Sequence, residues 1–254
     1  MSDESLQPQL PWIESQVPLP PVETAWGPHT DAPGLLAAGA DLGVPRLLEA
    51  YAMGVFPWFN PDQPVLWWSP DPRMVLQVSD FKLHRSLRKS LNRYAAHPGF
   101  ELCFDRNFDQ VIEACAQSPR EGQKGTWIVP EMVEAYKALH RAGFAHSAET
   151  WLDNQLVAGL YFVNIGKAIF GESMFSTISD GSKMALAALI NVCEQEHIKA
   201  IDCQQNTAHL ASMGAQEMSR SKFLIMTQTA IKLEAPNWQT CQIDWDQWRG
   251  SPKA

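Results

Sequence analysis

A run of predicted strands, a long helix and a further strand occupies residues 146–204, and it limits the folds that this chain can adopt. Short apolar segments alternate here with turn residues such as Asp153-Asn154-Gln155, which is typical of hairpin-connected strands. The three strands that this pattern predicts cover residues 146–151, 156–163 and 167–176. A helix over residues 182–196 and a strand over residues 198–204 follow. This order predicts a mixed sheet, built from an antiparallel meander and one later strand, with helices packed against it.

Proline is concentrated in the N-terminal part of the chain. Thirteen of the eighteen prolines lie in residues 1–72. Because proline neither continues a helix nor donates to a strand ladder, this part predicts an extended arm and short elements. Further helices are expected at residues 44–53, 108–116, 130–142 and 221–233. We therefore expect an α+β chain with two domains: a small N-terminal α/β domain with a proline-rich arm (1–72) and a larger domain (73–254).

Composition excludes several classes of protein. A hydrophobic content of 45% and a charged content of 19% are those of a globular chain. The longest apolar stretch, residues 184–193, is too short to span a membrane, and the acidic N-terminus lacks the features of a signal peptide. Five widely spaced cysteines without a C-x-x-C pair argue against a disulfide framework or a zinc site. The sequence therefore predicts a cytoplasmic protein without membrane association or a bound metal.

One basic cluster stands out in a chain whose net charge is −8. That charge argues against a protein that coats nucleic acid nonspecifically. Residues 82–93 nevertheless contain no acid and carry the cations Lys82, Arg85, Arg88, Lys89 and Arg93. Their spacings place several of them on one face of a helix. Such a face is either only solvated or a surface for a phosphate backbone, and in so acidic a chain we favour the phosphate backbone.

A carboxylate and a carboxamide lie where the strand over residues 198–204 ends. Strand periodicity places Asp202 and Gln204 on the same face, so the carboxylate could accept a hydrogen bond from the amide NH2. The amide carbonyl would then be free to accept from an incoming amine. A short helix follows, with Asn206 or Thr207 as its N-cap and Gly214 at its end. The spacing alone suits a pair that only caps this helix, and that is the commoner case.

Glu172 is the second carboxylate of interest, at the end of the third strand of the meander. It is either a surface residue that pairs with Lys183 or a carboxylate that binds a cationic substrate beside an apolar pocket. Met174, two residues later, favours the second interpretation. Methionine is flexible and polarisable, and it suits a pocket that accepts several unbranched or aromatic side chains.

The order of meander, helix and strand is also the core order of the GNAT acyltransferase fold, so we expect a GNAT-like larger domain. Enzymes of that fold bind coenzyme A through a [Q/R]-x-x-G-x-[G/A] turn, and residues 120–125 have the wrong spacing for it. The chain also lacks a Walker A loop, a dinucleotide fingerprint, an H-E-x-x-H motif and a G-x-S-x-G motif. We therefore expect no cofactor. An acyl-CoA-dependent N-acyltransferase and a non-enzymatic RNA- or peptide-binding module remain as alternatives.

Eight motifs, in order and at matching spacing, give the chain its family resemblance. They are residues 34–42 (GLLAAGADL), 56–59 (FPWF), 67–73 (WWSPDPR), 125–128 (GTWI), 171–176 (GESMFS), 182–183 (SK), 202–204 (DCQ) and 209–215 (HLASMGA). Together they resemble the leucyl/phenylalanyl-tRNA–protein transferase family over about residues 30–230. Two turn-like segments depart from it: Ala40 replaces a usual glycine, and Asp180-Gly181 replaces a usual Asn-Ala.

The resemblance implies transfer of Leu or Phe, and less readily Met, from aminoacyl-tRNA to the N-terminal amine of a protein that begins with Arg or Lys. The product would be marked for degradation. An aminoacyl ester is already activated, so this chemistry needs no ATP, metal or coenzyme. The enzyme must hold the two reactants together and manage one proton.

The resemblance and the chemistry together assign roles to particular residues. Gln204 would orient the attacking amine, Asp202 would position or polarise Gln204, and Glu172 would bind the acceptor's amine or basic side chain. The expected aminoacyl pocket contains Leu160, Ile169, Met174 and Ile201. The expected contacts of the terminal adenosine are Trp58, Trp127 and, as a weaker candidate, Tyr51. The basic cluster would meet the phosphates of the acceptor stem.

Overall fold

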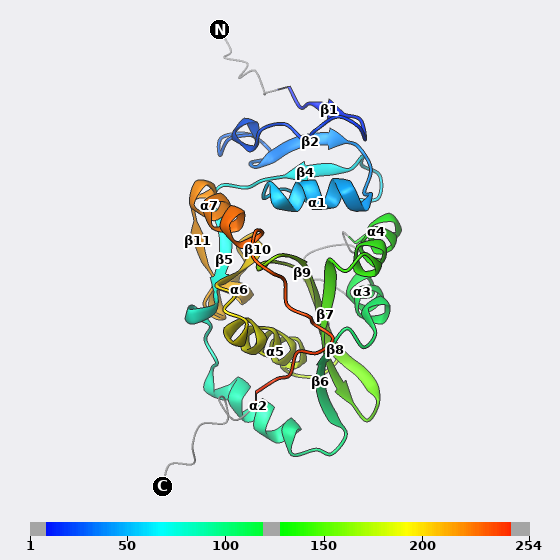
Figure 1. The fold of residues 1–254 in the computed structure, drawn as a ribbon, viewed down its shortest axis with the longest axis vertical. Coiled ribbons are helices and arrows are strands. Elements are labelled where there is room, and N and C mark those ends of the chain that lie inside the picture. The colour runs from blue at the N-terminus through cyan, green and yellow to red at the C-terminus, as the bar shows by residue number, and fades with distance from the viewer. Residues whose placement is uncertain (1–8, 119–127, 245–254) are drawn as a thin grey trace.

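The computed structural model describes residues 9–118 and 128–244, which form two sheets and the helices that pack on them (Figure 1). The strands are β1 (Trp12–Ile13), β2 (Leu35–Gly39), β3 (Phe56–Pro57), β4 (Leu66–Trp68), β5 (Arg73–Gln77), β6 (Phe100–Phe104), β7 (Ala145–Leu152), β8 (Gln155–Ile165), β9 (Ala168–Ser176), β10 (Ala200–Gln204) and β11 (Gln216–Met218). The helices are α1 (Val44–Ala52), α2 (Arg85–Ala95), α3 (Phe108–Gln117), α4 (Pro130–Arg141), α5 (Gly181–Gln195), α6 (Ala208–Ser212) and α7 (Arg220–Ala230). None of these helices is long and apolar enough to cross a membrane.

The larger sheet has the predicted mixed topology. Its strand order is β11-β5-β10-β9-β8-β7-β6. Strands β7, β8 and β9 form the antiparallel meander, and β10 returns after α5 to lie parallel to β9, with Ile201 opposite Ile169. On its other side β10 is antiparallel to β5. The expected α+β fold with a mixed sheet flanked by helices is therefore confirmed.

Helices cover both faces of the larger sheet (Figure 1). Helix α5 packs on one face, where Leu186 and Leu189 meet Leu160 of β8, and the apolar side of α2 joins them through Leu87 and Leu91. Helices α3 and α4 pack on the opposite face. Because buried side chains occupy both faces, the strands of the meander are apolar along most of their length.

The proline-rich part of the chain forms the smaller sheet, in the order β1-β2-β4-β3, with α1 beside it (Figure 1). The two-residue strand β1 is one of the short edge strands expected there. Trp67 is fully buried and donates from Nε1 to the carbonyl of Gly39, so it belongs to an aromatic core. Side chains of α1 and α4 lie in one apolar cluster, which joins this sheet to the larger one. The domain boundary near residue 72 stays a prediction.

Two of the positions that depart from the family pattern have left-handed backbone conformations. Ala40 has φ of 62° and Asp180 has φ of 63°, in the left-handed region that favours glycine and asparagine. Gly181 is closely surrounded, because a Cβ there would lie 2.5 Å from Oγ of Ser176 and 2.6 Å from Cβ of Ala158. Local geometry therefore constrains both segments.

Candidate functional site

A buried ion pair fixes Asp202 at the end of β10. Arg73 donates from Nε to Oδ1 of Asp202 (2.8 Å) and from Nη2 to Oδ2 (2.6 Å), and both side chains are almost completely buried. The guanidinium also donates to the carbonyl of Gly54 and lies between the rings of Phe56 and Phe223, at 4.8 and 4.6 Å. A bidentate pair of this kind holds a carboxylate in one orientation.

The expected hydrogen bond between the side chains of Asp202 and Gln204 is wrong in its details. The backbone N–H of Gln204, and not its amide NH2, donates to Oδ1 of Asp202 at 2.9 Å. The physical reason is a bulge: the pairing of β10 with β5 shifts between these residues, and Gln204 has φ of 61°. A bulge breaks the two-residue alternation on which the prediction depended. Asp202 therefore positions Gln204 through the backbone.

Glu172 on β9 accepts a hydrogen bond from the side-chain amide of Gln204. Nε2 of Gln204 donates to Oε1 of Glu172 at 2.8 Å, so the amide carbonyl is the group left to accept. The hydroxyls of Tyr51 and Tyr136 also donate to Glu172, at 2.7 and 3.1 Å, and contact each other. Lys183 pairs with Asp180 instead, so the surface alternative for Glu172 is wrong.

Burial raises the pKa of Glu172 to about 7. The nearby charge of Asp202 also raises it, while hydrogen bonds from Tyr51, Tyr136 and Gln204 lower it. The pKa values of the two tyrosines lie well above their usual value, because burial and the Glu172 charge both disfavour a phenolate. Glu172 is thus a carboxyl group that can change protonation near neutral pH.

This raised pKa predicts that stability falls as the pH rises from about 4.5 to about 7. In that window the folded chain keeps a proton on Glu172 that the unfolded chain has lost, because an ordinary glutamate titrates near 4.5. The contribution of Glu172 to the free energy of unfolding is therefore complete at pH values below its pKa in the unfolded chain. It is lost as the pH rises through the pKa of Glu172 in the folded chain, and the loss is at most about 3 kcal/mol. Urea unfolding at pH 5 and pH 8 measures it. Glu172→Gln, which does not titrate, should lose less stability across this range, and equal losses in both proteins would contradict the assignment.

An apolar cavity of about 240 Å³ opens beside Glu172. Three of the four expected pocket residues line it, namely Leu160, Met174 and Ile201. The sequence did not indicate its other walls: Tyr161, Gly171, Ser173, Leu186, Leu189, Cys203, Thr207, His209 and Leu210. Cavities for drug-sized ligands are about 300–1,000 Å³, so this one suits a single large side chain.

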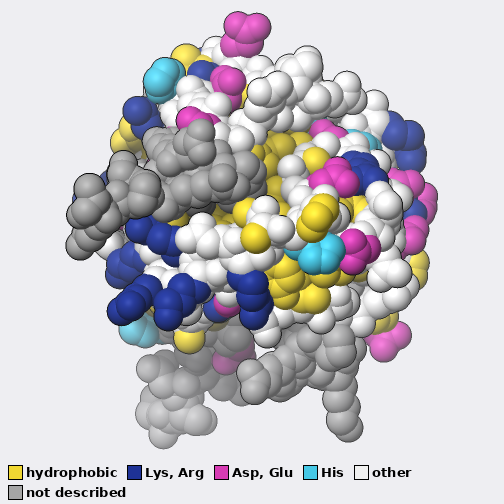
Figure 2. All heavy atoms as spheres, turned by 90° about the horizontal axis from the view of Figure 1, so that it is seen from below, with side chains coloured by type: hydrophobic (Ala, Val, Ile, Leu, Met, Phe, Trp, Pro, Cys, Tyr) yellow, Lys and Arg dark blue, Asp and Glu magenta, His cyan; other side chains and the backbone are white. Residues whose placement is uncertain are grey.

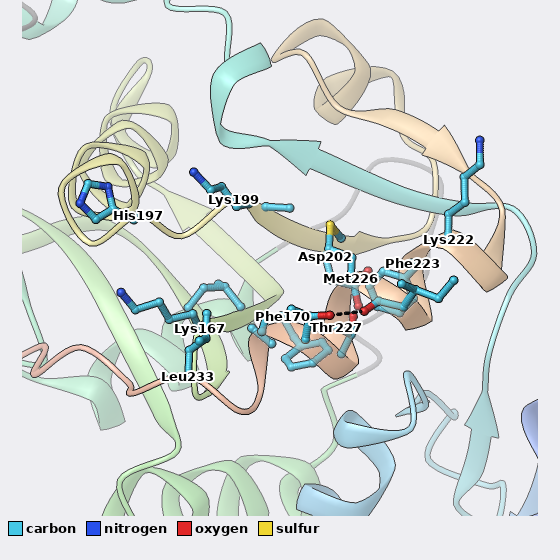
Figure 3. Close-up of a pocket in the computed structure, with 16 residues that line it drawn as sticks. Lys167, Phe170, His197, Lys199, Asp202, Lys222, Phe223, Met226, Thr227 and Leu233 are labelled. Carbon is cyan, nitrogen blue, oxygen red and sulfur yellow. Dashed lines mark hydrogen bonds between the residues drawn. The ribbon is translucent and has the colours of Figure 1, made fainter.

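Ile169 packs in the same apolar cluster as Leu160 and Ile201 but does not line the cavity. It lines a separate cavity of about 310 Å³ between α7 and the β9–β10 pair (Figure 3). Asp202 and Phe223 belong to this second cavity, and the side chains of Lys199 and Lys222 extend away from its apolar centre (Figure 3).

Of the three residues expected to hold the terminal adenosine, the structure describes Trp58 and Tyr51. Trp58 is half-buried and packs edge-on against Trp68, which donates from Nε1 to its carbonyl. Tyr51 offers no exposed ring face, because it is fully buried. Its hydroxyl donates to Glu172. Trp127 lies outside the described residues.

The basic cluster lies on and just before α2. The side chains of Lys82, Arg85, Arg88, Lys89 and Arg93 are all exposed. The opposite side of the helix is anchored by Leu87 and Leu91 in the core. Helix α2 lies at the lower end of the molecule in Figure 1, and the face seen from below carries a group of Lys and Arg side chains beside an apolar region (Figure 2).

Cys203 borders the cavity, but its thiol is poorly suited to be a nucleophile. Burial raises the pKa of Cys203 to about 12, with a further increase from the Asp202 charge. The thiolate, and not the thiol, is the nucleophilic form. Cys203 is therefore not expected to act as a nucleophile.

A solved structure of similar shape is that of L-PGS from Bacillus licheniformis. It shares 12% identity with this chain at a TM-score of 0.40, over 77% of this chain and 72% of that chain. A likeness this weak carries no argument about function.

Sequence relatives are much closer. The family model described as leucyl/phenylalanyl-tRNA protein transferase matches residues 75–228, and the model of its N-terminal domain matches residues 40–71. A leucyl/phenylalanyl-tRNA–protein transferase of Polaromonas sp. is 56% identical over 94% of this chain and 93% of its own length. Another, from Albidiferax ferrireducens, is 53% identical over 96% of both chains. This chain belongs to the leucyl/phenylalanyl-tRNA protein transferase family.

Proposed function

We propose that this aminoacyltransferase moves Leu or Phe, and less readily Met, from aminoacyl-tRNA to the N-terminal amine of proteins that begin with Arg or Lys. The acceptors would thereby be marked for degradation in the cytoplasm. The observation that carries the proposal is the hydrogen-bonded pair of Glu172 and Gln204 beside an apolar cavity of about 240 Å³. An activated ester needs no further cofactor, and these residues supply what remains, which is positioning and proton transfer.

The reaction replaces one bond to the ester carbonyl carbon with another. The acceptor's α-amine nitrogen attacks that carbon, the carbon–nitrogen bond forms, and the bond to the 3′-terminal ribose oxygen breaks. The nitrogen loses a proton and the ribose oxygen gains one. Gln204 is suited to orient the amine, because Glu172 binds its NH2 and its carbonyl would accept a hydrogen bond from the amine. A carboxamide is too weak a base to remove the proton itself.

Glu172 is suited to bind and deprotonate the acceptor amine. Its pKa of about 7 lies close to the ordinary α-amino pKa of about 7.7–8.0, so a proton passes between the two groups at little cost. The tyrosine hydroxyls of Tyr51 and Tyr136 hold the carboxylate in place. Asp202, held by Arg73, positions the backbone of Gln204.

The cavity is proposed to hold the aminoacyl side chain. Its walls combine the leucines of α5 with Leu160, Met174 and Ile201. A β-branched side chain would fit poorly in a space shaped for Leu or Phe. Met174 adapts to side chains of different shape, which is consistent with acceptance of methionine.

The tRNA is proposed to contact two regions. Trp58 and Trp127 would hold the terminal adenosine by stacking, and the exposed cations of α2 would meet the acceptor-stem phosphates. In this arrangement, residues 1–72 form a smaller domain beside the larger domain of residues 73–254.

Reversing two charges on α2 is expected to weaken tRNA binding. Arg85→Glu together with Arg88→Glu should lower affinity at least tenfold at low salt and flatten the dependence of log Kd on log salt, because fewer counterions are released. Filter binding of aminoacyl-tRNA at several salt concentrations measures both effects. The control is Lys199→Glu with Lys222→Glu, which removes two exposed lysines elsewhere. Equal effects of the two pairs would show that α2 is only a solvated face.

The acyl-CoA-dependent alternative is not favoured, since the relatives described above are tRNA–protein transferases. The direct test of the proposed function is transfer of labelled Phe from Phe-tRNA to two reporter proteins that differ only in an N-terminal Arg or Ala. Label should reach the Arg reporter and not the Ala reporter. Equal labelling of both would contradict the proposed acceptor specificity.

A further inference from the structure

Three side chains that can bind a metal ion lie close together, away from the Glu172 cavity. Asp105 follows β6, His140 lies in the last turn of α4, and His146 lies near the start of β7. Each offers one ligand atom, and these atoms lie within 4.8 Å of one another. They border a cavity of about 540 Å³ whose other wall is formed by residues 235–239. None of these residues lines the Glu172 cavity described above.

One ring nitrogen of His140 is held by the backbone. Its Nδ1 lies 2.7 Å from the carbonyl oxygen of Ala145, and its ring stacks on Phe108 at 4.3 Å. A carbonyl only accepts, so Nδ1 carries a hydrogen and Nε2 is the nitrogen that could bind a metal ion. Histidines that bind metals are usually oriented in this way, with the second nitrogen donating to a carbonyl or carboxylate.

His146 lies between two hydrogen-bond acceptors. Its Nδ1 is 2.6 Å from Oδ2 of Asp105, and its Nε2 is 3.2 Å from the carbonyl oxygen of Gly143. A neutral imidazole has one N–H group and can satisfy only one of these oxygens. In its neutral form the ring can therefore offer its other nitrogen to a metal ion.

The carboxylate of Asp105 is held in place for this contact. Its Oδ1 accepts from the backbone N–H of Ser147 at 2.8 Å, which leaves Oδ2 directed at His146. The side chains of Asp105 and His146 are 3% and 12% exposed. The ligands are therefore ordered and shielded, while the adjoining cavity keeps one side open.

We propose that Asp105, His140 and His146 bind a divalent transition metal ion of the Zn²⁺ class. Two imidazoles and one carboxylate are a common three-residue ligand set for zinc, with a fourth position open to solvent or ligand. Ligand atoms of a tetrahedral zinc site lie about 3.4 Å apart, so the cluster closes with shifts of about 1 Å. The expectation of no metal concerned local motifs, whereas these ligands come from three elements. The proposal does not depend on the transferase activity.

The test is zinc binding to the full-length, metal-free chain, measured by equilibrium dialysis with ZnCl2. One Zn²⁺ per chain is expected, and His140→Ala and Asp105→Asn should each lower the affinity at least tenfold. Co²⁺ in place of Zn²⁺ should give the visible absorption of a tetrahedral site, which the variants lose. His140 is half-buried and stacks on Phe108, so thermal unfolding checks that the variants remain folded.

The matched control is His97→Ala. His97 also lies beside an aspartate, Asp153, at 3.8 Å, but both are exposed and the pair is not part of a three-ligand group. Its replacement should leave zinc binding unchanged. No binding to the native chain, or equal affinity of the native chain and His140→Ala, would overturn the proposal.

Discussion

Replacing Glu172 by glutamine is expected to lower the rate of aminoacyl transfer by about 100-fold or more, the effect of losing a positioned acid–base group. Glutamine keeps the size of the side chain and can still accept from Tyr51, but it has no charge for the acceptor amine and cannot take its proton. Affinity for aminoacyl-tRNA should change little, because the α2 cations and the apolar walls of the cavity are unchanged. Single-turnover transfer with saturating Phe-tRNA measures the rate, and filter binding measures the affinity.

The matched control is Glu217→Gln on β11. Glu217 also accepts from a side-chain amide, that of Asn206 at 2.9 Å, but it is exposed and does not line the cavity. Its replacement should leave transfer unchanged. A Glu172→Gln protein with native transfer and native folding would remove Glu172 from the chemistry and leave it only a structural role.

Replacing Arg73 by methionine is expected to lower the free energy of unfolding by about 3–5 kcal/mol. The change leaves the Asp202 carboxylate buried without its partner, and it removes the guanidinium from between Phe56 and Phe223. Urea unfolding measures the loss. The double variant with Asp202→Asn should be less destabilised than the sum of the two single variants, because the uncompensated charge is gone.

Lys137→Met is the control for this prediction. Lys137 forms an ion pair of similar length with Glu113, at 2.6 Å, but that glutamate is half exposed to water. Surface pairs contribute about 1 kcal/mol or less, so the effect should be small. Similar losses in the Arg73 and Lys137 variants would contradict the claim that burial makes the Arg73–Asp202 pair special.

The sequence predicted the long elements of the fold well, because each has a strong local pattern. The meander, α5 and β10 were all expected, and Thr207 caps α6 as one of the two candidates proposed. The two- to five-residue strands β2, β3, β4, β6 and β11 were not. Such short strands carry too few residues for a periodic signal, and they are stabilised by partners that are distant in sequence.

The site was predicted in its residues but not in its contacts. Glu172 and Gln204 were both named, yet their direct hydrogen bond depends on a bulge that a regular strand pattern does not reveal. Arg73 and Tyr136 were missed because each reaches the site from another element, across long sequence separations. The cluster of Asp105, His140 and His146 was missed for the same reason.

The central claim is that Glu172 and Gln204 act on the acceptor amine while the cavity holds the aminoacyl side chain. Its most direct test is the pH dependence of single-turnover Phe transfer to an Arg-starting protein, for the native chain, Gln204→Ala and Glu172→Gln. The native rate should rise with pH through an apparent pKa near 7, as Glu172 ionises. Gln204→Ala should be slower but keep a rise, and Glu172→Gln should be slow and lose the rise near 7. A native profile without that rise, or the same profile in Glu172→Gln, would contradict the account.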